Sequence, residues 1–184
     1  MLKGNQAVAL LRMQVDTARQ WLEGTMQGVT PEQAHWAPPG TAMPIGATYA
    51  HVVTGQDGMV NGMLRGKPPR FAVSHAGKTG LSELPPGPDP ARPGFPDWTE
   101  WSRRVRVDLP LLLAYGEAVF EDTDAWLATL SDADLDRPVD LSAVGMGTVP
   151  LAFVLNNAVL GNAIAHCGEI ACLKGVQGGR GYAI

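Results

Sequence analysis

The feature that most restricts the fold is a long apolar segment near the C-terminus. Its apolar residues recur at steps of three and four, which is the spacing of one face of an α-helix. The stripe runs through Leu151, Leu155, Val159, Asn162, His166, Ile170 and Leu173. Asn162 and His166 thus occupy positions where leucine is expected. A buried imidazole needs a partner for each ring nitrogen, and a metal ion is one partner that it can have.

The remaining faces of this predicted helix are also largely apolar. A helix of about 20 apolar residues could cross a membrane, but Asn156, Asn157 and Glu169 interrupt this one. We therefore predict a buried central helix that starts at Pro150, because proline fits the first turn of a helix, and we expect no membrane partner. A small bundle hides only part of such a surface, and exposed apolar patches usually contact another chain, so we predict a homodimer.

A second histidine, His51, lies in a predicted helix over residues 45–64. We expect the core face of this helix to consist of Ile45, Tyr49, Val52, Met59 and Met63. On the other side, His51 is followed at helical spacing by Gly55, Gly58 and Gly62. A glycine inside a helix costs about 1 kcal/mol relative to alanine, so something must favour small residues on this face. Close helix packing and an open groove leading to His51 are two explanations, and they are compatible.

The other segments complete a bundle of helices. We predict a first helix over residues 3–27, a short turn capped by Thr30, and a third long helix over 97–130 that is kinked at Pro110. Residues 66–97 are rich in proline and show little periodicity. A connection of that length lets consecutive helices run parallel. The fold class that we predict is therefore an all-α four-helix bundle with a long crossover loop between helices two and three.

The composition is that of one globular domain that spans residues 1–184. Hydrophobic residues make up 45% and charged residues 17%, and the net charge of −4 without a basic run argues against nucleic acid as a partner. The first twenty residues lack the uninterrupted apolar core of a signal peptide, so we expect a cytoplasmic protein. Acidic residues at four positions are most simply a solvated edge: Asp132, Asp134, Asp136 and Asp140. Cys167 and Cys172 point in different directions on one predicted helix, which indicates reduced core residues.

Three segments stand out by their order and spacing: Trp36-Ala-Pro-Pro-Gly40, Ile45-Gly-Ala-Thr-Tyr-Ala-His51, and His166-Cys-Gly-Glu-Ile-Ala-Cys-Leu-Lys-Gly175. Together they resemble the DinB-like family of metal-binding four-helix bundles, over nearly the whole chain. Members of that family usually carry three metal-binding histidines, one from the second helix and two from the last helix in a His-x-x-x-His arrangement. The resemblance implies that His51 and His166 are ligands, with Asn162 in place of the middle histidine. A neutral amide oxygen binds zinc or nickel less well than an imidazole nitrogen, so the expected metal affinity is weak or absent.

The resemblance also implies a class of reaction. Some members of the family are metal-dependent transferases that act with low-molecular-weight thiols, and others have no established activity. The chain is accordingly expected to be a metal-dependent enzyme of the thiol S-transferase or hydrolase class with a small-molecule substrate. Glu169, three residues after His166, is the candidate general base or the group that orients a ligand. Two alternatives stay open: a binding or stress-associated bundle without metal, and a hydrogen-bonded histidine pair that Asn162 bridges.

Overall fold

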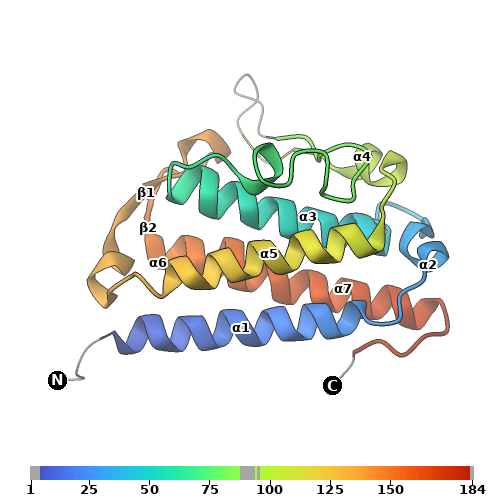
Figure 1. Ribbon diagram of the computed structural model, residues 1–184, viewed down its shortest axis with the longest axis horizontal. Helices are drawn as coiled ribbons and strands as arrows, with labels where there is room; N and C mark the ends of the chain where they lie inside the picture. The colour runs from blue at the N-terminus through green and yellow to red at the C-terminus, as the bar shows by residue number, and fades with distance from the viewer. Residues whose placement is uncertain (1–4, 88–93, 95, 183–184) are drawn as a thin grey trace.

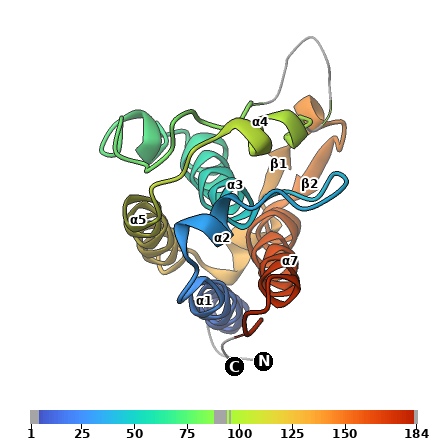
Figure 2. The same ribbon diagram turned by 90° about the vertical axis from the view of Figure 1, so that its right-hand side faces the viewer.

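The computed structural model describes residues 5–87, 94 and 96–182, and within them it confirms the predicted all-α bundle (Figures 1 and 2). Four long helical columns pack side by side. They are α1 (Gln6–Met26), α3 (Ile45–Asp57) continued by the π-helix η1 (Gly58–Leu64), α5 (Leu109–Leu127), and α6 (Leu151–Val154) continued by the π-helix η5 (Leu155–Gly161) and α7 (Asn162–Val176). In Figure 1, α1 and α7 run in one direction and α3 and α5 in the other, as the long crossover predicts. The first helix begins at Gln6, and residues 3 and 4 of its predicted range lie outside the described residues.

Shorter elements connect the columns. They are α2 (Pro31–His35), the 3-10 turns η2 (Arg70–Ala72), η3 (Asp132–Asp136) and η4 (Ser142–Val144), α4 (Thr99–Arg104), and the strands β1 (Pro138–Asp140) and β2 (Thr148–Pro150). The two strands pair antiparallel, with Val139 opposite Val149. The predicted cap of α2 is confirmed, because the Thr30 side chain accepts from the backbone N–H of Gln33 and the Gln33 side chain accepts from the N–H of Thr30. Residues 88–93 of the predicted crossover lie outside the described residues.

The third long helix differs from its prediction. It is divided into α4 and α5, and the chain between them is extended enough for Val107 to form an isolated antiparallel bridge with Leu81. Pro110 therefore does not kink a continuous helix. It occupies the first turn of α5, where its missing N–H is not needed, and the side chain of Asp108 caps that turn by accepting from the N–H of Leu111 at 3.2 Å.

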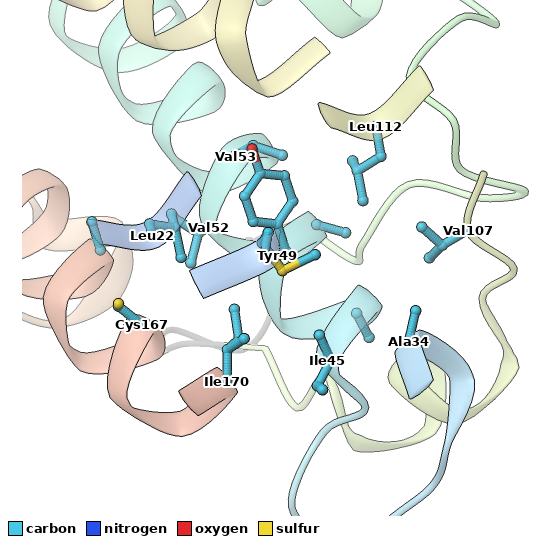
Figure 3. Close-up of a cluster of buried hydrophobic side chains, with 14 of the residues drawn as sticks. Leu22, Ala34, Ile45, Tyr49, Val52, Val53, Val107, Leu112, Cys167 and Ile170 are labelled. Carbon is cyan, nitrogen blue, oxygen red and sulfur yellow. The ribbon is translucent and has the colours of Figure 1, made fainter. Parts of the chain in front are cut away.

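The core fills the space between the four columns. At the end nearest α2 it consists of large side chains from every column, among them Leu22, Ile45, Tyr49, Leu112 and Ile170, each with no exposed surface (Figure 3). A second cluster fills the opposite end around Leu127, Leu151 and Leu155. Burial of such aliphatic and aromatic side chains contributes about 1.5–3 kcal/mol each, so packing of this kind is what holds the columns at fixed positions.

A π-helix shifts the buried stripe of the α3–η1 column by one residue. Met59 and Met63, which the periodicity placed in the core, are half-buried and 40% exposed respectively. Val60 and Leu64 are buried in their place. In a π-helix each hydrogen bond spans five residues instead of four, so a wide turn holds an extra residue and rotates the residues after it. The prediction for Met63 was wrong because it assumed a constant 3.6-residue period, whereas Met59, although only half-buried, packs against the second core cluster.

The same shift occurs in the last column, after η5. Asn162 and His166 are half-buried, whereas Ala163 and Cys167, one position later, face the core. The sequence placed Asn162 and His166 on the buried stripe, and that part of the prediction is corrected. The wide turn rotates His166 to the edge of the core, where its ring faces α3. Cys172 is also not a core residue, because its side chain is exposed. Both cysteines are free thiols, as predicted.

Asp57 fastens the start of the crossover to the bundle. This carboxylate is completely buried at the end of α3. It accepts hydrogen bonds from the backbone N–H groups of Arg70 and Phe71 and from the side chains of Asn61 and Tyr115, at 2.7–3.0 Å. A buried carboxylate is tolerated when its oxygens are satisfied in this way.

The N-terminal end of α1 is capped from a distant part of the chain. The carboxylate of Asp132 accepts from the backbone N–H groups of Ala7 at 3.2 Å and Val8 at 3.0 Å. Asp134 accepts from the backbone and the side chain of Ser131. The prediction of a merely solvated acidic edge was therefore wrong for these two residues.

The C-terminal end of α1 is held from α7. The ammonium group of Lys174 is buried and donates to the carbonyl oxygens of Thr25 at 2.6 Å and Gln27 at 3.0 Å. Burial lowers the pKa of Lys174. Helix carbonyls at a C-terminus lack partners within the helix, and a cation there also interacts favourably with the helix dipole.

Candidate metal site

His51 and His166 come together although they lie far apart in the chain. α3 and α7 are neighbours with opposite directions (Figure 2), and His51 from the middle of α3 meets His166 from the middle of α7. The centroids of the two rings are 5.0 Å apart and their planes make an angle of 83°. The convergence expected from the sequence is thus found, and it places two imidazole donors at one point of the α3–α7 edge.

The surroundings of His51 keep it neutral. Burial lowers its pKa to about 4, and the nearby His166 contributes in the same direction. Trp98 lies against the ring with a centroid distance of 4.3 Å and an interplanar angle of 51°. The indole N–H of Trp98 donates to the carbonyl oxygen of Pro86 at 3.2 Å, which connects the crossover to the site. Sequence reasoning missed Trp98 because nothing in its spacing relates it to His51.

His166 is oriented by Glu169. The ring nitrogen Nδ1 lies 2.7 Å from the carboxylate oxygen Oε2, and the side chains of His166 and Glu169 are 16% and 55% exposed. A carboxylate can only accept, so Nδ1 carries a hydrogen, and Nε2 is the nitrogen left to face another partner. Carboxylates commonly hold metal-binding histidines in this manner. The contact supports the orienting role of Glu169 more directly than a role as general base.

Asn162 lies one helical turn before His166, so both residues share one face of α7. Its side chain is half-buried. Among the residues that the structure describes, no group of three or more His, Cys, Asp or Glu side chains is placed to hold a metal ion. The donor set at this point therefore consists of two imidazoles, with an amide at the position where a third imidazole would complete a common zinc arrangement.

The separation of the two rings fits a shared ion. With metal–nitrogen bonds of about 2.0–2.1 Å and ring nitrogens about 1.1 Å from their ring centre, a tetrahedral ion bound by both rings needs centroids about 5 Å apart. The observed distance is 5.0 Å. A hydrogen-bonded histidine pair would also fit this distance. The distance alone therefore does not favour a metal ion, and the argument for one needs the orientation that Glu169 gives to the ring of His166.

The face of the α3–η1 column that carries Gly55, Gly58 and Gly62 is largely free of contacts. A Cβ atom added to Gly55 or Gly58 would meet no atom within 4 Å, and one added to Gly62 would lie 3.6 Å from Cγ of Pro69. Close helix packing is therefore not the reason for Gly55 and Gly58, and that explanation is corrected. Gly55 lies one turn after His51, so this unfilled face adjoins the histidine pair.

α1 and α5 adjoin on the side of the bundle opposite to α3 and α7 (Figure 2). A separate hollow lies between the end of α1 and the start of α5. Its volume is about 370 Å³, and its walls are mainly apolar, with Met26, Leu109 and Leu113 among them. Glu23 is the ionisable residue among the described side chains that line it, and burial raises the pKa of this carboxyl although Arg19 lies 2.8 Å away. None of these described lining residues is a histidine, so the two histidines of the α3–α7 edge remain the candidate metal ligands.

Comparisons with known proteins bear on the fold and the family. The chain is similar to a conserved protein from Enterococcus faecalis of known crystal structure, with a TM-score of 0.75 and 21% identity over 92% of this chain and 96% of the other. At that identity the likeness shows the fold alone. None of the curated proteins matches the chain. A family model described as the DinB superfamily matches residues 14–170, which include both histidines, and the chain therefore belongs to the DinB superfamily.

Proposed function

We propose that the chain binds a divalent transition metal ion, zinc or nickel, through His51 and His166, with Asn162 as a weak third ligand. We further propose that it acts as a metal-dependent enzyme of the thiol S-transferase or hydrolase class on a small molecule. One observation carries the proposal: two imidazole rings from different helices lie 5.0 Å apart, and one of them is oriented by a carboxylate.

The residues of the chain prepare such a site. His51 is neutral because its pKa is lowered to about 4, so its lone pair is free at neutral pH. Glu169 fixes the ring of His166, and Trp98 covers one side of His51 and excludes water there. A metal ion bound here would lower the pKa of a coordinated thiol or water molecule. We propose that a substrate reaches the same point from the side of Gly55 and Gly58, where an added Cβ would meet no atom within 4 Å.

A second candidate function is a binding protein that no longer uses a metal. The observation in its favour is the asparagine at position 162, because an amide oxygen is a poor ligand for zinc or nickel. In that case the two histidines are a polar pair that lines a pocket for an organic ligand.

Zinc titration of untagged protein distinguishes the two candidates. We expect one ion per chain by calorimetry, together with a change in the fluorescence of Trp98, which touches His51. His51→Ala and His166→Ala should each abolish binding. His75→Ala is the matched control, since His75 lies against Tyr115, away from the pair, and should leave the affinity unchanged. Absence of stoichiometric binding by the unaltered protein would refute the metal proposal and favour the second candidate.

A further inference from the structure

The hollow between the end of α1 and the start of α5 is held in shape on both sides by hydrogen bonds. On the α1 side, Lys174 donates to the carbonyl oxygen of Gln27, which lines the hollow, at 3.0 Å. On the α5 side, Pro110 lies in the first turn of the helix, and the side chain of Asp108 caps that turn. A pocket that is already formed in the free protein loses less free energy to ordering when a ligand binds.

The hollow has the size and the surface of a site for a small organic molecule. Its volume is about 370 Å³, whereas an apolar cavity of about 150 Å³ holds one molecule of benzene. The apolar lining includes Met26, which is buried, and Leu113, which is half-buried. A ring with a short chain would therefore fit and would remove apolar surface from water.

One carboxylate lines this apolar surface. Glu23 is half-buried, and its oxygen Oε2 accepts from Arg19 at 2.8 Å. Among the described residues, Arg19 alone donates to this carboxylate, so its oxygen Oε1 is left for another partner. Burial raises the pKa of Glu23, and Glu117 and Asp16 contribute in the same direction. The single charge of Arg19 therefore does not balance the three carboxylates around it, and the excess of negative charge favours a cation.

A buried polar group from α3 ends close to the same carboxylate. Tyr49 has no exposed surface, and its hydroxyl lies against Gly116 of α5, where an added Cβ would clash with it (Figure 3). Within the described part of the chain, this hydroxyl has no hydrogen-bond partner. Burial raises the pKa of Tyr49, and Glu23 and Glu117 add to the effect, so the hydroxyl lies within electrostatic reach of the hollow. An unpaired buried hydroxyl calls for an explanation, and a polar group held at Glu23 is one that this arrangement offers.

We propose that this hollow binds a small organic cation, an ammonium compound with an apolar ring or chain, whose charge pairs with Glu23. An anion fits less well, because Pro110 has no N–H and the carboxylate of Asp108 already accepts from the N–H of Leu111 at the start of α5. The site is separate from the histidine pair, since α1 and α5 adjoin on the side opposite to α3 and α7 (Figure 2). Binding there does not depend on a metal ion.

Three compounds with one apolar body and different polar ends test the proposal: phenylbutylamine, phenylbutanol and phenylbutanoate. NMR titration of the isotope-labelled protein near neutral pH measures their affinities, and the backbone signal of Gly28 reports on the hollow because Gly28 lines it. The amine should bind at least about tenfold more tightly than the alcohol, since a hydrogen bond to a charged group is stronger than a neutral one. The carboxylate should bind more weakly than the alcohol.

Two pairs of variants locate the contacts. Glu23→Gln should weaken binding of the amine about tenfold and leave that of the alcohol unchanged. Asp124→Asn is its matched control, because Asp124 also pairs with an arginine of α1 at 2.8 Å but does not line the hollow. Leu113→Trp should weaken all three compounds by filling the hollow, whereas Leu111→Trp, at a 48% exposed position of the same helix, should not. Circular dichroism melting of each variant shows that it is folded.

Four results would overturn the proposal. They are equal affinities of the amine and the alcohol for the unaltered protein, binding of the amine that Glu23→Gln leaves intact, and no saturable binding at millimolar concentration. The fourth is a Gly28 signal that moves on dilution without any compound, which would make a second copy of the chain the occupant. His166→Ala should leave the affinity for the amine unchanged, so a failure of the metal proposal would not count against this site.

Discussion

Replacement of Asp57 by asparagine should destabilise the protein strongly. The two oxygens of this buried carboxylate accept hydrogen bonds from four donors, two at each oxygen. Oδ1 accepts from Asn61 Nδ2 and from the N–H of Arg70, and Oδ2 accepts from the N–H of Phe71 and the hydroxyl of Tyr115. In Asp57→Asn one oxygen becomes an NH₂ group, which cannot accept. Whichever way the amide turns, two donors therefore lose their partner.

The expected cost depends on the number of bonds lost. A hydrogen bond to a charged group contributes about 1.5–3 kcal/mol, so the loss of two costs about 3–6 kcal/mol. Tyr115→Phe removes only one of the four and should cost about 1.5–3 kcal/mol. Since whole domains are stable by about 5–15 kcal/mol, Asp57→Asn should remove a large share of the free energy of unfolding.

Urea unfolding followed by circular dichroism measures both values. Asp108→Asn is the control, because Asp108 caps α5 at the surface and asparagine is an equally good cap. Its effect should be close to zero. A cost below about 1 kcal/mol for Asp57→Asn, or a larger cost for Tyr115→Phe than for Asp57→Asn, would refute this role of the carboxylate. Protease cleavage near Arg70 should also become faster in Asp57→Asn, since the η2 turn loses its attachment to α3.

Four further predictions concern other parts of the molecule. Asn162→His should tighten zinc or nickel binding roughly tenfold or more in a calorimetric titration, and an unchanged affinity would show that position 162 does not face the ion. The pKa of His51 is about 4 in the fold and about 6.5 in the unfolded chain, so the unfolded chain binds more protons between these two pH values. The free energy of unfolding should therefore fall as the pH drops from about 6.5 to 4. Urea titrations across that range should show a weaker pH dependence for His51→Gln. Gly55→Ala should raise the stability by about 0.5–1 kcal/mol, because the added Cβ meets nothing within 4 Å, and a destabilised variant would restore the packing explanation. Lys174→Met should lower the stability by about 1–3 kcal/mol, less than Asp57→Asn, because it removes two bonds to the end of α1 but also relieves the burial of the ammonium group that lowers the pKa of Lys174; an unchanged melting temperature would contradict that role.

Local signals in the sequence sufficed for the helices and their order. The apolar spacing predicts the four columns, the capping residues around Thr30 predict the start of α2, and the proline-rich crossover predicts that α3 and α5 run parallel. These features depend on neighbours within a few residues or on the length of a connection, and both can be read from one chain. The convergence of His51 and His166 was predictable only through the family resemblance, because no local pattern relates two residues that lie so far apart.

The errors about which residues face the core came from a change of helical period. Periodicity assigned Met63 and His166 to the core, and the structure buries the next residue in each case, Leu64 and Cys167. A π-turn has no strong signature in composition, and one extra residue rotates the side chains that follow it, although Ile170 and Leu173 later in α7 are buried as predicted. The partners of Asp132 and Trp98 were also beyond reach, since each contact joins segments that only the finished fold brings together.

The two distant attachments of α1 have a consequence for biosynthesis. Of the four columns, α1 leaves the ribosome before the other three, and it obtains its N-terminal cap from Asp132 and its C-terminal attachment from Lys174, which are made much later. Until then its ends lack these partners, and the apolar side chains that the finished fold buries, such as Leu22, are exposed. Contacts between remote segments slow folding, and exposed apolar surface during that delay favours aggregation or binding by chaperones. In a nascent chain that stops before residue 174, the C-terminal end of α1 should therefore lack its hydrogen bonds to α7. These bonds form only when the last turns of α7 have been made.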